Sequence, residues 1–313
     1  MNTIHKEFIP VMLTPFKENG EIDFNGLTEL TEFYIKSGAS GLFSNCLSSE
    51  MFELTEQERL QVVKHVVNVA GGAVRVVATG TFGGEIQTQA NFVKKIYETG
   101  ADAVIVITNM LASQQEPDEV FNAHMFKLLD LTDSIPLGFY ECPVPYKRLI
   151  SPEQLELFVA TNRIIYHKDT CLDIEQVKQK LKAGNERDFG LYDAYMGHAV
   201  VSLKAGASGL SCIQGNYWPE LIVWLCENFN NSSLTKQVDR VQQFFIDNMV
   251  VMHHAYPVTA KYYLQKRGLS ISTFTRQEVG ILTSEIKNNI DKLYIDYNNL
   301  ENELELGLKT GCI

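Results

Sequence analysis

Short runs of β-branched and apolar residues recur along the chain, with starts about 20 to 33 residues apart. Most of these runs are continuously hydrophobic rather than alternating, a pattern typical of parallel strands that are covered by helices. The pattern predicts eight strands, over residues 8–14, 41–45, 74–80, 103–108, 135–142, 164–169, 189–193 and 209–213.

Segments in which apolar residues recur at helical spacing follow these strands. Two of them carry clear start signals, because Thr55 and Glu58 form a capping box and Ser151 is followed by Pro152 at the first helical position. The spacing predicts eight helices, over residues 24–36, 55–69, 85–98, 117–131, 152–160, 174–183, 196–204 and 219–229.

One predicted helix follows each predicted strand, so the chain repeats a βα unit eight times. Such alternation indicates a parallel sheet, and eight units favour a closed barrel. An open doubly wound sheet is the alternative, but no predicted strand leads into the GxGxxG turn of a dinucleotide site. We therefore predict an α/β fold, a (β/α)8 TIM barrel over residues 1–230.

The strand pattern stops after residue 230. Helical spacing continues over residues 234–254, 259–267 and 276–305, and no Gly/Ser/Pro-rich linker marks a boundary. We expect residues 231–313 to form a C-terminal helical extension packed on the barrel, with a separate binding domain as the alternative.

Composition and charge narrow the possible partners. The 313 residues are 45% hydrophobic, and 27 Lys and Arg against 38 Asp and Glu give a net charge of −11, with the basic residues scattered. Nucleic acid is therefore not an expected partner. No apolar run reaches the roughly 18 residues that a membrane span needs, so we expect no membrane partner and a cytoplasmic protein. The cysteines form no CxxC pair, and we expect them to be reduced and mostly buried: Cys46, Cys142, Cys171, Cys212, Cys226 and Cys312.

A lysine stands near the end of the sixth predicted strand, at the barrel end where reactive groups lie. Because side chains alternate along a strand, Lys168 shares a face with Ile164 and Tyr166 and points into the barrel if that face is the inner one. Desolvation there lowers the pKa of a lysine, and a neutral amine can attack a ketone. The alternative is an ion pair with Asp169 or another carboxylate at the rim.

Two further segments offer polar groups at the same end of the barrel. Tyr140 ends the fifth strand, next to Lys168, where a phenol can move protons; a packed core tyrosine is the alternative. The second strand leads into a turn at residues 45–50 whose hydroxyl and N–H groups can hold a carboxylate, although the same residues also suit an ordinary capping turn.

These segments together resemble the dihydrodipicolinate synthase/N-acetylneuraminate lyase superfamily of class I aldolases, over residues 9 to about 269. The resemblance rests on the following positions: Leu13, Thr14, Pro15, Phe16, Gly20, Asp23, Gly41, Leu42, Phe43, Glu50, Leu54, Thr55, Glu58, Arg59, Gly80, Thr81, Ala101, Asp102, Ala103, Tyr140, Pro143, Lys168, Gly206, Ala207, Ser208, Gly209, Asn216, Pro257 and Lys261.

The resemblance implies a lyase whose Lys168 forms a Schiff base with pyruvate or another 2-oxo acid, usually as a homotetramer and without a metal or organic cofactor. Lys168 and Tyr140 are then the catalytic residues, with the lysine as electron sink and the tyrosine as proton relay. Ser48 and Ser49 would hold the carboxylate of the small-molecule 2-oxo acid. Ser211 would add a hydroxyl to the pocket, with a packed strand serine as the alternative.

Several positions depart from the family pattern. Leu47 replaces the first hydroxyl residue of the turn, and Leu111 stands where many members have a second relay tyrosine. No arginine follows Tyr140 until Arg148, so synthesis of dihydrodipicolinate is a poor expectation. We expect Lys147 and Arg148 to be solvated at the start of the next helix; the alternative is that one of them replaces the arginine if the turn at residues 143–145 redirects the loop. Residues 192–195 also lack a counterpart of the Gly-Tyr-Asp-Glu run of sialic acid lyases.

The sequence thus leaves three readings open. A Schiff-base lyase, aldolase or dehydratase acting on a 2-oxo acid or its aldol adduct is the leading hypothesis. A weakened barrel that binds a 2-oxo acid or sugar acid without turnover is the alternative, motivated by the lost relay groups at Leu47 and Leu111. A purely structural role, with a collapsed pocket, is the third.

Overall fold

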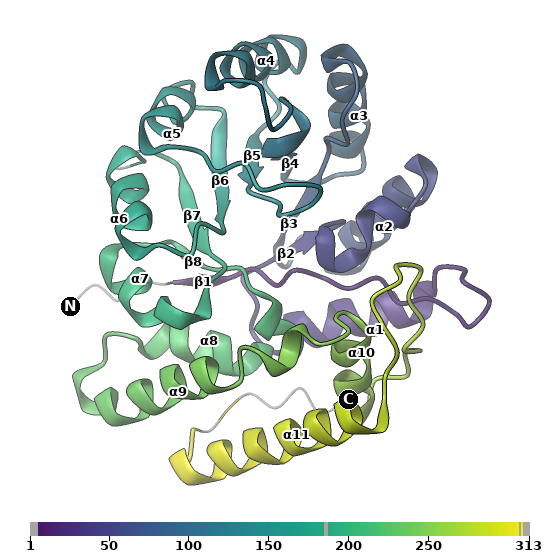
Figure 1. The fold of residues 1–313 in the computed structure, drawn as a ribbon, viewed down its shortest axis with the longest axis vertical. Helices are drawn as coiled ribbons and strands as arrows, with labels where there is room; N and C mark the ends of the chain where they lie inside the picture. Colours follow the sequence, from purple (N-terminus) through teal and green to yellow (C-terminus); the bar gives the residue numbers. More distant parts are fainter. Residues whose placement is uncertain (1–5, 185–186, 307, 309–313) are drawn as a thin grey trace.

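The computed structural model describes residues 6–184, 187–306 and 308, and it forms a barrel of parallel strands with helices on the outside (Figure 1). Neighbouring strands follow the order β1-β8-β7-β6-β5-β4-β3-β2. The remaining gap between β1 and β2 is bridged by a parallel contact of Val11 with Phe43, in which the Met12 N–H donates to the Phe43 carbonyl at 3.0 Å. The prediction of a TIM barrel is confirmed.

All eight predicted strands are present, several of them shorter than predicted. They are β1 (Glu7–Phe8), β2 (Gly41–Ser44), β3 (Arg75–Thr79), β4 (Ala103–Ile107), β5 (Leu137–Tyr140), β6 (Ile164–Asp169), β7 (Gly190–Asp193) and β8 (Gly209–Leu210). Proline explains two of the differences, because Pro10 and Pro136 carry no N–H to donate to a neighbouring strand. At the seam of β1 and β8, a Cβ on Gly209 would overlap the Glu7 carbonyl, so only glycine fits there.

The helices follow the strands in the predicted order. They are α1 (Phe24–Lys36), α2 (Glu56–Ala70), α3 (Ile86–Glu98), α4 (Asp118–Leu131), α5 (Pro152–Val159), α6 (Ile174–Ala183), α7 (Ala199–Ala205) and α8 (Pro219–Asn228). Both capping boxes form, since Thr55 accepts from the Glu58 N–H and Ser151 accepts from the Gln154 N–H. These start signals therefore located helix N-termini correctly.

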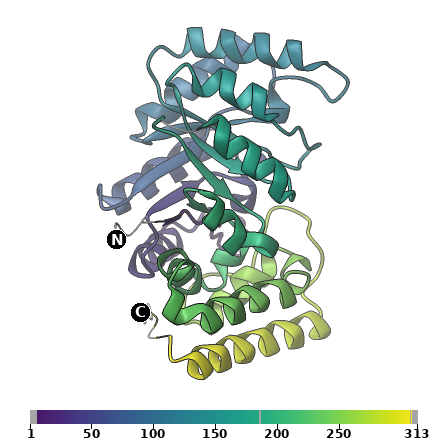
Figure 2. The ribbon, with the colours of Figure 1, turned by 90° about the vertical axis from the view of Figure 1, so that its left-hand side faces the viewer.

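Three further helices lie beside α8 and α1, namely α9 (Thr235–Asp247), α10 (Val258–Lys266) and α11 (Ser284–Leu304), and α9 and α11 run side by side below the barrel (Figure 2). Their apolar faces share one core with α1 and α8. In it Trp218 stacks on Tyr297 with ring centroids 5.9 Å apart, and Arg267 pairs with Glu220 at 2.7 Å. The division of the chain at residue 230 stays a prediction.

Two of the predicted C-terminal helices differ from the observed ones. The helix predicted over 234–254 ends at Asp247, where the Asn248 side chain and N–H both bond the Phe244 carbonyl, and a short 3-10 helix, η7 (Val251–His253), follows. The helix predicted over 276–305 begins only at Ser284. Thr283 is its N-cap and accepts from the Ile286 N–H, whereas the N–H groups of Arg276 and Gln277 donate to Glu50.

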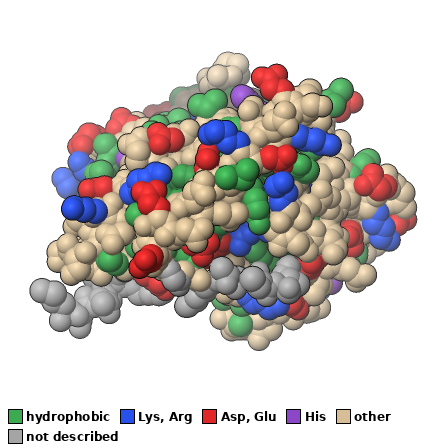
Figure 3. Space-filling model, turned by 90° about the horizontal axis from the view of Figure 1, so that it is seen from below, with side chains coloured by type: hydrophobic (Ala, Val, Ile, Leu, Met, Phe, Trp, Pro, Cys, Tyr) green, Lys and Arg blue, Asp and Glu red, His purple; other side chains and the backbone are tan. Residues whose placement is uncertain are grey.

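The surface agrees with the absence of a large basic patch in the sequence. On the face seen in Figure 3, acidic and basic side chains are interspersed. Among the described helices, none combines the length and the apolar character that crossing a bilayer requires. Cys46, Cys142, Cys212 and Cys226 are buried free thiols and Cys171 is a half-buried one, whereas Cys312 lies outside the described residues.

Candidate active site

A cavity of about 480 Å³ opens at the carboxyl ends of the barrel strands. Its walls combine the ends of β5 to β8, the turn after β2 and the segment that precedes α10. The lining residues are mostly apolar, and among those that the structure describes none is an aspartate, glutamate or arginine: Leu47, Ser48, Tyr140, Pro143, Val144, Lys147, Lys168, Thr170, Leu172, Ala194, Tyr195, Met196, Cys212, Ile213, Gln214, Met249, His253, Tyr256, Pro257 and Gln277.

Lys168 projects from β6 into this cavity. Its side chain is 4% exposed, and its Nζ lies 4.3 Å from the centroid of the Tyr140 ring and 5.8 Å from that of Phe43. The register of the sheet places Lys168 directly opposite Tyr140 on β5. Within residues 6–184, 187–306 and 308, no carboxylate lies within salt-bridge distance of the Lys168 amine. The rim ion pair, the alternative left open by the sequence, therefore does not form with these residues.

Burial controls the protonation of both groups. Desolvation lowers the pKa of Lys168 from its ordinary value of 10.5, and the thiols of Cys46, Cys142 and Cys212 oppose this effect only partly. Burial, together with the nearby Cys142 and Cys46 side chains, raises the pKa of Tyr140. The site thus favours a neutral amine beside a neutral phenol, which is the pairing that nucleophilic attack with proton transfer needs.

The turn after β2 presents Ser48 to the cavity. It forms a single 3-10 turn, η1 (Leu47–Ser49), between two residues in the left-handed region, Asn45 at φ 54° and Glu50 at φ 56°. Glu50 is held from the C-terminal side by the Lys261 ammonium at 2.9 Å. Among the described residues, neither the Leu47 nor the Ser48 N–H has a hydrogen-bond acceptor. The turn therefore offers two free amides and one hydroxyl.

The other two predicted binding serines lie away from the cavity walls. The Ser49 hydroxyl donates to the Met12 carbonyl at 2.6 Å and accepts from the Cys46 N–H at 3.0 Å, so it fastens the turn to β1. Ser211 is fully buried and accepts from the Tyr166 hydroxyl at 3.2 Å. Ser48, Tyr140 and Lys168 are thus brought together, whereas Ser49 and Ser211 lie behind them.

Tyr256 is a cavity residue that the sequence interpretation missed. Its hydroxyl donates to Ser48 at 2.7 Å and accepts from the Asn216 amide at 2.6 Å. The neighbouring family position Pro257 marked this segment, but no local pattern shows that a residue more than 200 positions away along the chain meets the turn after β2.

Lys147 and Arg148 take different positions. Arg148 lies outside the cavity, where its guanidinium pairs with Asp118 at 2.7 Å and donates to the Ser113 carbonyl at 2.9 Å. Lys147 is exposed, as expected, but it also lines the cavity, where its ammonium donates to the Thr170 carbonyl at 2.8 Å. The expectation of solvation is wrong for Arg148, whose side chain is only 10% exposed because Asp118 and backbone carbonyls engage it. Leu47 also lines the cavity, whereas Leu111 is buried in the core between α3 and α4.

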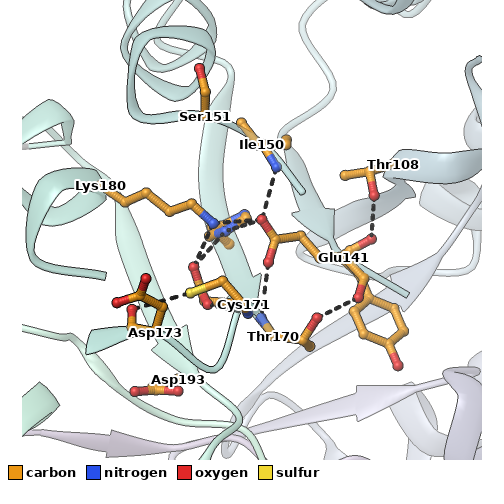
Figure 4. Close-up of polar contacts among 12 residues, drawn as sticks. Thr108, Glu141, Ile150, Ser151, Thr170, Cys171, Asp173, Lys180 and Asp193 are labelled. Atoms are coloured by element: carbon orange, nitrogen blue, oxygen red, sulfur yellow. Dashed lines mark hydrogen bonds and ion pairs between the residues drawn. The ribbon is translucent and has the colours of Figure 1, made fainter. Parts of the chain in front are cut away.

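A second polar cluster lies on the opposite face of β5 and β6 (Figure 4). Lys180 from α6 contacts Glu141 at 2.6 Å and Asp169 at 2.7 Å, and all three side chains are buried. His167 Nε2 lies 3.6 Å and 3.5 Å from the same two carboxylates. Glu141, His167 and Asp169 are close enough to share a metal ion, but the Lys180 ammonium already supplies the positive charge.

Comparison with known proteins identifies the family of this chain. A model of the dihydrodipicolinate synthetase family matches residues 5–295. The 4-hydroxy-tetrahydrodipicolinate synthase of Pseudoalteromonas atlantica is 27% identical over 287 residues, which cover 90% of this chain and 94% of that protein. The enzyme of the same name from Bacillus subtilis is 24% identical over 264 residues, covering 84% and 89%.

Solved structures show the same fold. A monomeric dihydrodipicolinate synthase variant superposes with a TM-score of 0.85 at 19% identity, covering 95% of this chain and 98% of that one. YagE, a prophage protein of the dihydrodipicolinic acid synthase family from E. coli K12 in complex with pyruvate, has a TM-score of 0.83 at 20% identity, covering 96% and 99%. The chain belongs to the dihydrodipicolinate synthetase family, which is a family of lyases of the aldolase type.

Proposed function

We propose that this protein is a Schiff-base-forming lyase, an aldolase or dehydratase, that acts on pyruvate or another 2-oxo acid or on its aldol adduct. One observation carries the proposal: the Lys168 amine is buried, faces the cavity beside Tyr140 and has no carboxylate partner among the described residues. The open cavity argues against a purely structural role.

The chemistry follows from the neutral amine. The Lys168 nitrogen attacks C2 of the 2-oxo acid, and the carbinolamine loses water to give a protonated imine. Electrons released when the bond at C3 breaks, or when C3 loses a proton, are accepted by the iminium to form an enamine. Tyr140 donates and accepts the protons of dehydration and of the reacting hydroxyl, since it stands opposite Lys168 in the sheet register.

We assign carboxylate binding to the turn after β2. The Ser48 hydroxyl and the amides of Leu47 and Ser48 are the groups of that turn without an acceptor among the described residues. Ser49 then acts by holding the turn against β1, and Ser211 by holding Tyr166 beneath the cavity. Both serines support the site without touching the substrate.

We further propose that the second substrate is not aspartate semialdehyde. The arginine that would hold its carboxylate is missing before Arg148, and Arg148 is engaged outside the cavity by Asp118. The mostly apolar walls and the relay positions Leu47 and Leu111 support the same conclusion. Family membership also supports a homotetramer in the cytoplasm, which light scattering and fractionation would test.

Borohydride reduction in the presence of a panel of 2-oxo acids tests the proposal. We expect a stable adduct on Lys168, located by peptide mass spectrometry, and none on the variant Lys168→Arg, which keeps the positive charge but cannot form an imine. Absence of an adduct with every 2-oxo acid would overturn the proposal. The same panel with aldehydes, aspartate semialdehyde included, then identifies the second substrate by turnover.

A second candidate is a barrel that binds a 2-oxo acid or sugar acid without turnover. The observation that favours it is the loss of both relay groups, with apolar side chains at Leu47 and Leu111. Binding of pyruvate detected as a thermal shift, without an adduct and unchanged by Lys168→Arg, would support this candidate over the lyase.

A further inference from the structure

Four side chains form a chain of hydrogen bonds that ends at the cavity. Of the four residues, only Ser48 has a role in the proposed reaction. Tyr34 donates to the Asn216 Oδ1 at 2.5 Å, the Asn216 Nδ2 donates to the Tyr256 oxygen at 2.6 Å, and the Tyr256 hydroxyl donates to the Ser48 Oγ at 2.7 Å. The chain joins α1, the end of the barrel after β8, the segment before α10 and the turn after β2.

The orientation of the Asn216 amide sets the direction of these bonds. Its oxygen faces Tyr34 and can only accept, and its nitrogen faces Tyr256 and can only donate. The single proton of Tyr256 is then available to Ser48. Burial raises the pKa of both Tyr34 and Tyr256, which keeps the two phenols protonated and able to donate.

The consequence falls on Ser48. Its oxygen accepts from Tyr256, and its own proton has no acceptor among the described residues although the side chain lines the cavity. Hydrogen bonds in such a chain polarise one another, so the last hydroxyl is a stronger donor than a lone serine. We propose that Tyr256 is a positioning residue that orients and polarises Ser48 as the donor to the 2-oxo acid carboxylate.

This inference rests on the proposed function and deepens it. Leu47 removes the hydroxyl that many family members place beside Ser48, and the chain instead brings a phenol from the C-terminal segment to this turn. The arrangement is made within one chain. It predicts selectivity for 2-oxo acids over neutral ketones, because a negatively charged acceptor gains most from a polarised donor.

Reduced-imine trapping with pyruvate and with pyruvamide tests the role of Tyr256. Pyruvamide keeps the ketone but replaces the carboxylate by a neutral amide. For Tyr256→Phe we expect the half-saturating concentration of pyruvate to rise about fivefold, because Ser48 keeps its hydroxyl but loses the group that orients it and strengthens its hydrogen bond to the charged carboxylate. The value for pyruvamide should change less than about twofold, since a neutral amide gains little from polarisation of Ser48.

Tyr217→Phe is the matched control. Tyr217 is a buried phenol that bonds the same C-terminal segment, at Met252 (3.2 Å) and Thr259 (3.0 Å), but lies outside the cavity and the chain. The variant should leave unchanged the ratio of the half-saturating concentration of pyruvate to that of pyruvamide. Tyr34→Phe removes the far end of the chain and should raise the ratio of the half-saturating concentration of pyruvate to that of pyruvamide by a smaller factor than Tyr256→Phe does.

The outcomes separate the two proposals. If pyruvate is trapped on Lys168 of the wild-type protein but Tyr256→Phe leaves the ratio of the two half-saturating concentrations unchanged, only the inference about Tyr256 is overturned. An equal loss for both probes also overturns it, because it shows a structural role only. No trapping on the wild-type protein overturns the proposed function and this inference with it.

Discussion

The two faces of the β5–β6 pair hold two buried lysines in opposite environments. Lys168 faces the cavity with aromatic rings around its amine, whereas Lys180 lies on the outer face between Glu141 and Asp169. Burial lowers the pKa of Lys168. For Lys180 burial acts in the same direction, but the two carboxylates outweigh it and raise its pKa above the ordinary value. The position of carboxylates, not burial, decides which amine can react.

The outer cluster also explains why the inner pair is in register. Glu141 follows Tyr140 and Asp169 follows Lys168 directly in the sequence. Because side chains alternate along a strand, locking these carboxylates together through Lys180 fixes the adjacent side chains of Tyr140 and Lys168 on the inner face. Glu141 strengthens the lock by accepting from the N–H groups of Ile150 and Thr170, both at 2.9 Å.

Removal of the outer ammonium should have the largest effect. Lys180→Met leaves two buried carboxylates without their counter-charge, and we expect the free energy of unfolding to fall by about 3–5 kcal/mol in urea denaturation. Lys178→Met is the control on the same helix, where the exposed pair with Glu175 contributes less than about 1 kcal/mol. Equal losses in the two variants would contradict the distinction between paired and exposed charges.

A carboxylate placed beside Lys168 should give this lysine the electrostatic environment of Lys180, in which the charged form is stabilised. Cys212 lines the cavity and acts electrostatically on Lys168. In Cys212→Asp we expect the rate of imine trapping at neutral pH to fall about tenfold or more, because an adjacent carboxylate raises the pKa of Lys168 and lowers the fraction of neutral amine. The uncharged variant Cys212→Asn should lose much less. An equal loss in both would mean that volume, not charge, controls the amine.

The contribution of the outer carboxylates to the free energy of unfolding should depend on pH in the acid range. Burial opposes the ionisation of Asp169, but His167 and Lys180 outweigh it and hold its pKa below the ordinary value of 3.8. A lowered pKa stabilises the fold above the ordinary value, and this stability is lost as the pH falls toward the folded-state pKa. The deficit of Lys180→Met should therefore shrink by about 1–2 kcal/mol below pH ~4, where protonated carboxyl groups need no counter-charge. A deficit independent of pH would refute this.

The smallest expected effect is a gain of stability on removal of the reactive amine. Lys168→Met should stabilise the protein by about 1 kcal/mol at neutral pH, because a buried group without a counter-charge costs stability. The unfolded state binds the lysine proton more tightly, so this gain is largest below the folded pKa and vanishes as the pH rises toward 10.5. Thermal unfolding of both proteins at two pH values measures this gain. A loss of stability in Lys168→Met at neutral pH would contradict the claim that the Lys168 amine is buried without a counter-charge.

The sequence was sufficient for the barrel and for placing Lys168 and Tyr140 on neighbouring strands. Continuous apolar runs and capping boxes locate strands and helices locally, and strand alternation alone places Lys168 on one face with Tyr166. The sequence left open whether that face is the inner one, and the structure answers this by placing both Lys168 and Tyr140 in the cavity wall.

The remaining features depend on contacts between distant segments. Tyr256 reaches Ser48 across 208 positions, and the Glu50 contact with Arg276, in a segment predicted to be helical, spans 226. Ser49 has the residue type that binds a carboxylate, yet its hydroxyl is used by Met12. Local patterns report residue type and periodicity, and they carry no information on which partner satisfies a buried hydroxyl.

The most direct test of the account is the pH dependence of lysine reactivity in the unliganded protein. Labelling with a neutral amine-reactive reagent, read out for each peptide by mass spectrometry, gives the midpoint of ionisation for Lys168 and Lys180 in one experiment. The account predicts a midpoint for Lys168 below 10.5 and one for Lys180 above it. A Lys168 midpoint at or above 10.5 would contradict the claim that burial lowers the pKa of this amine and favours the neutral form that the proposed attack on a carbonyl needs.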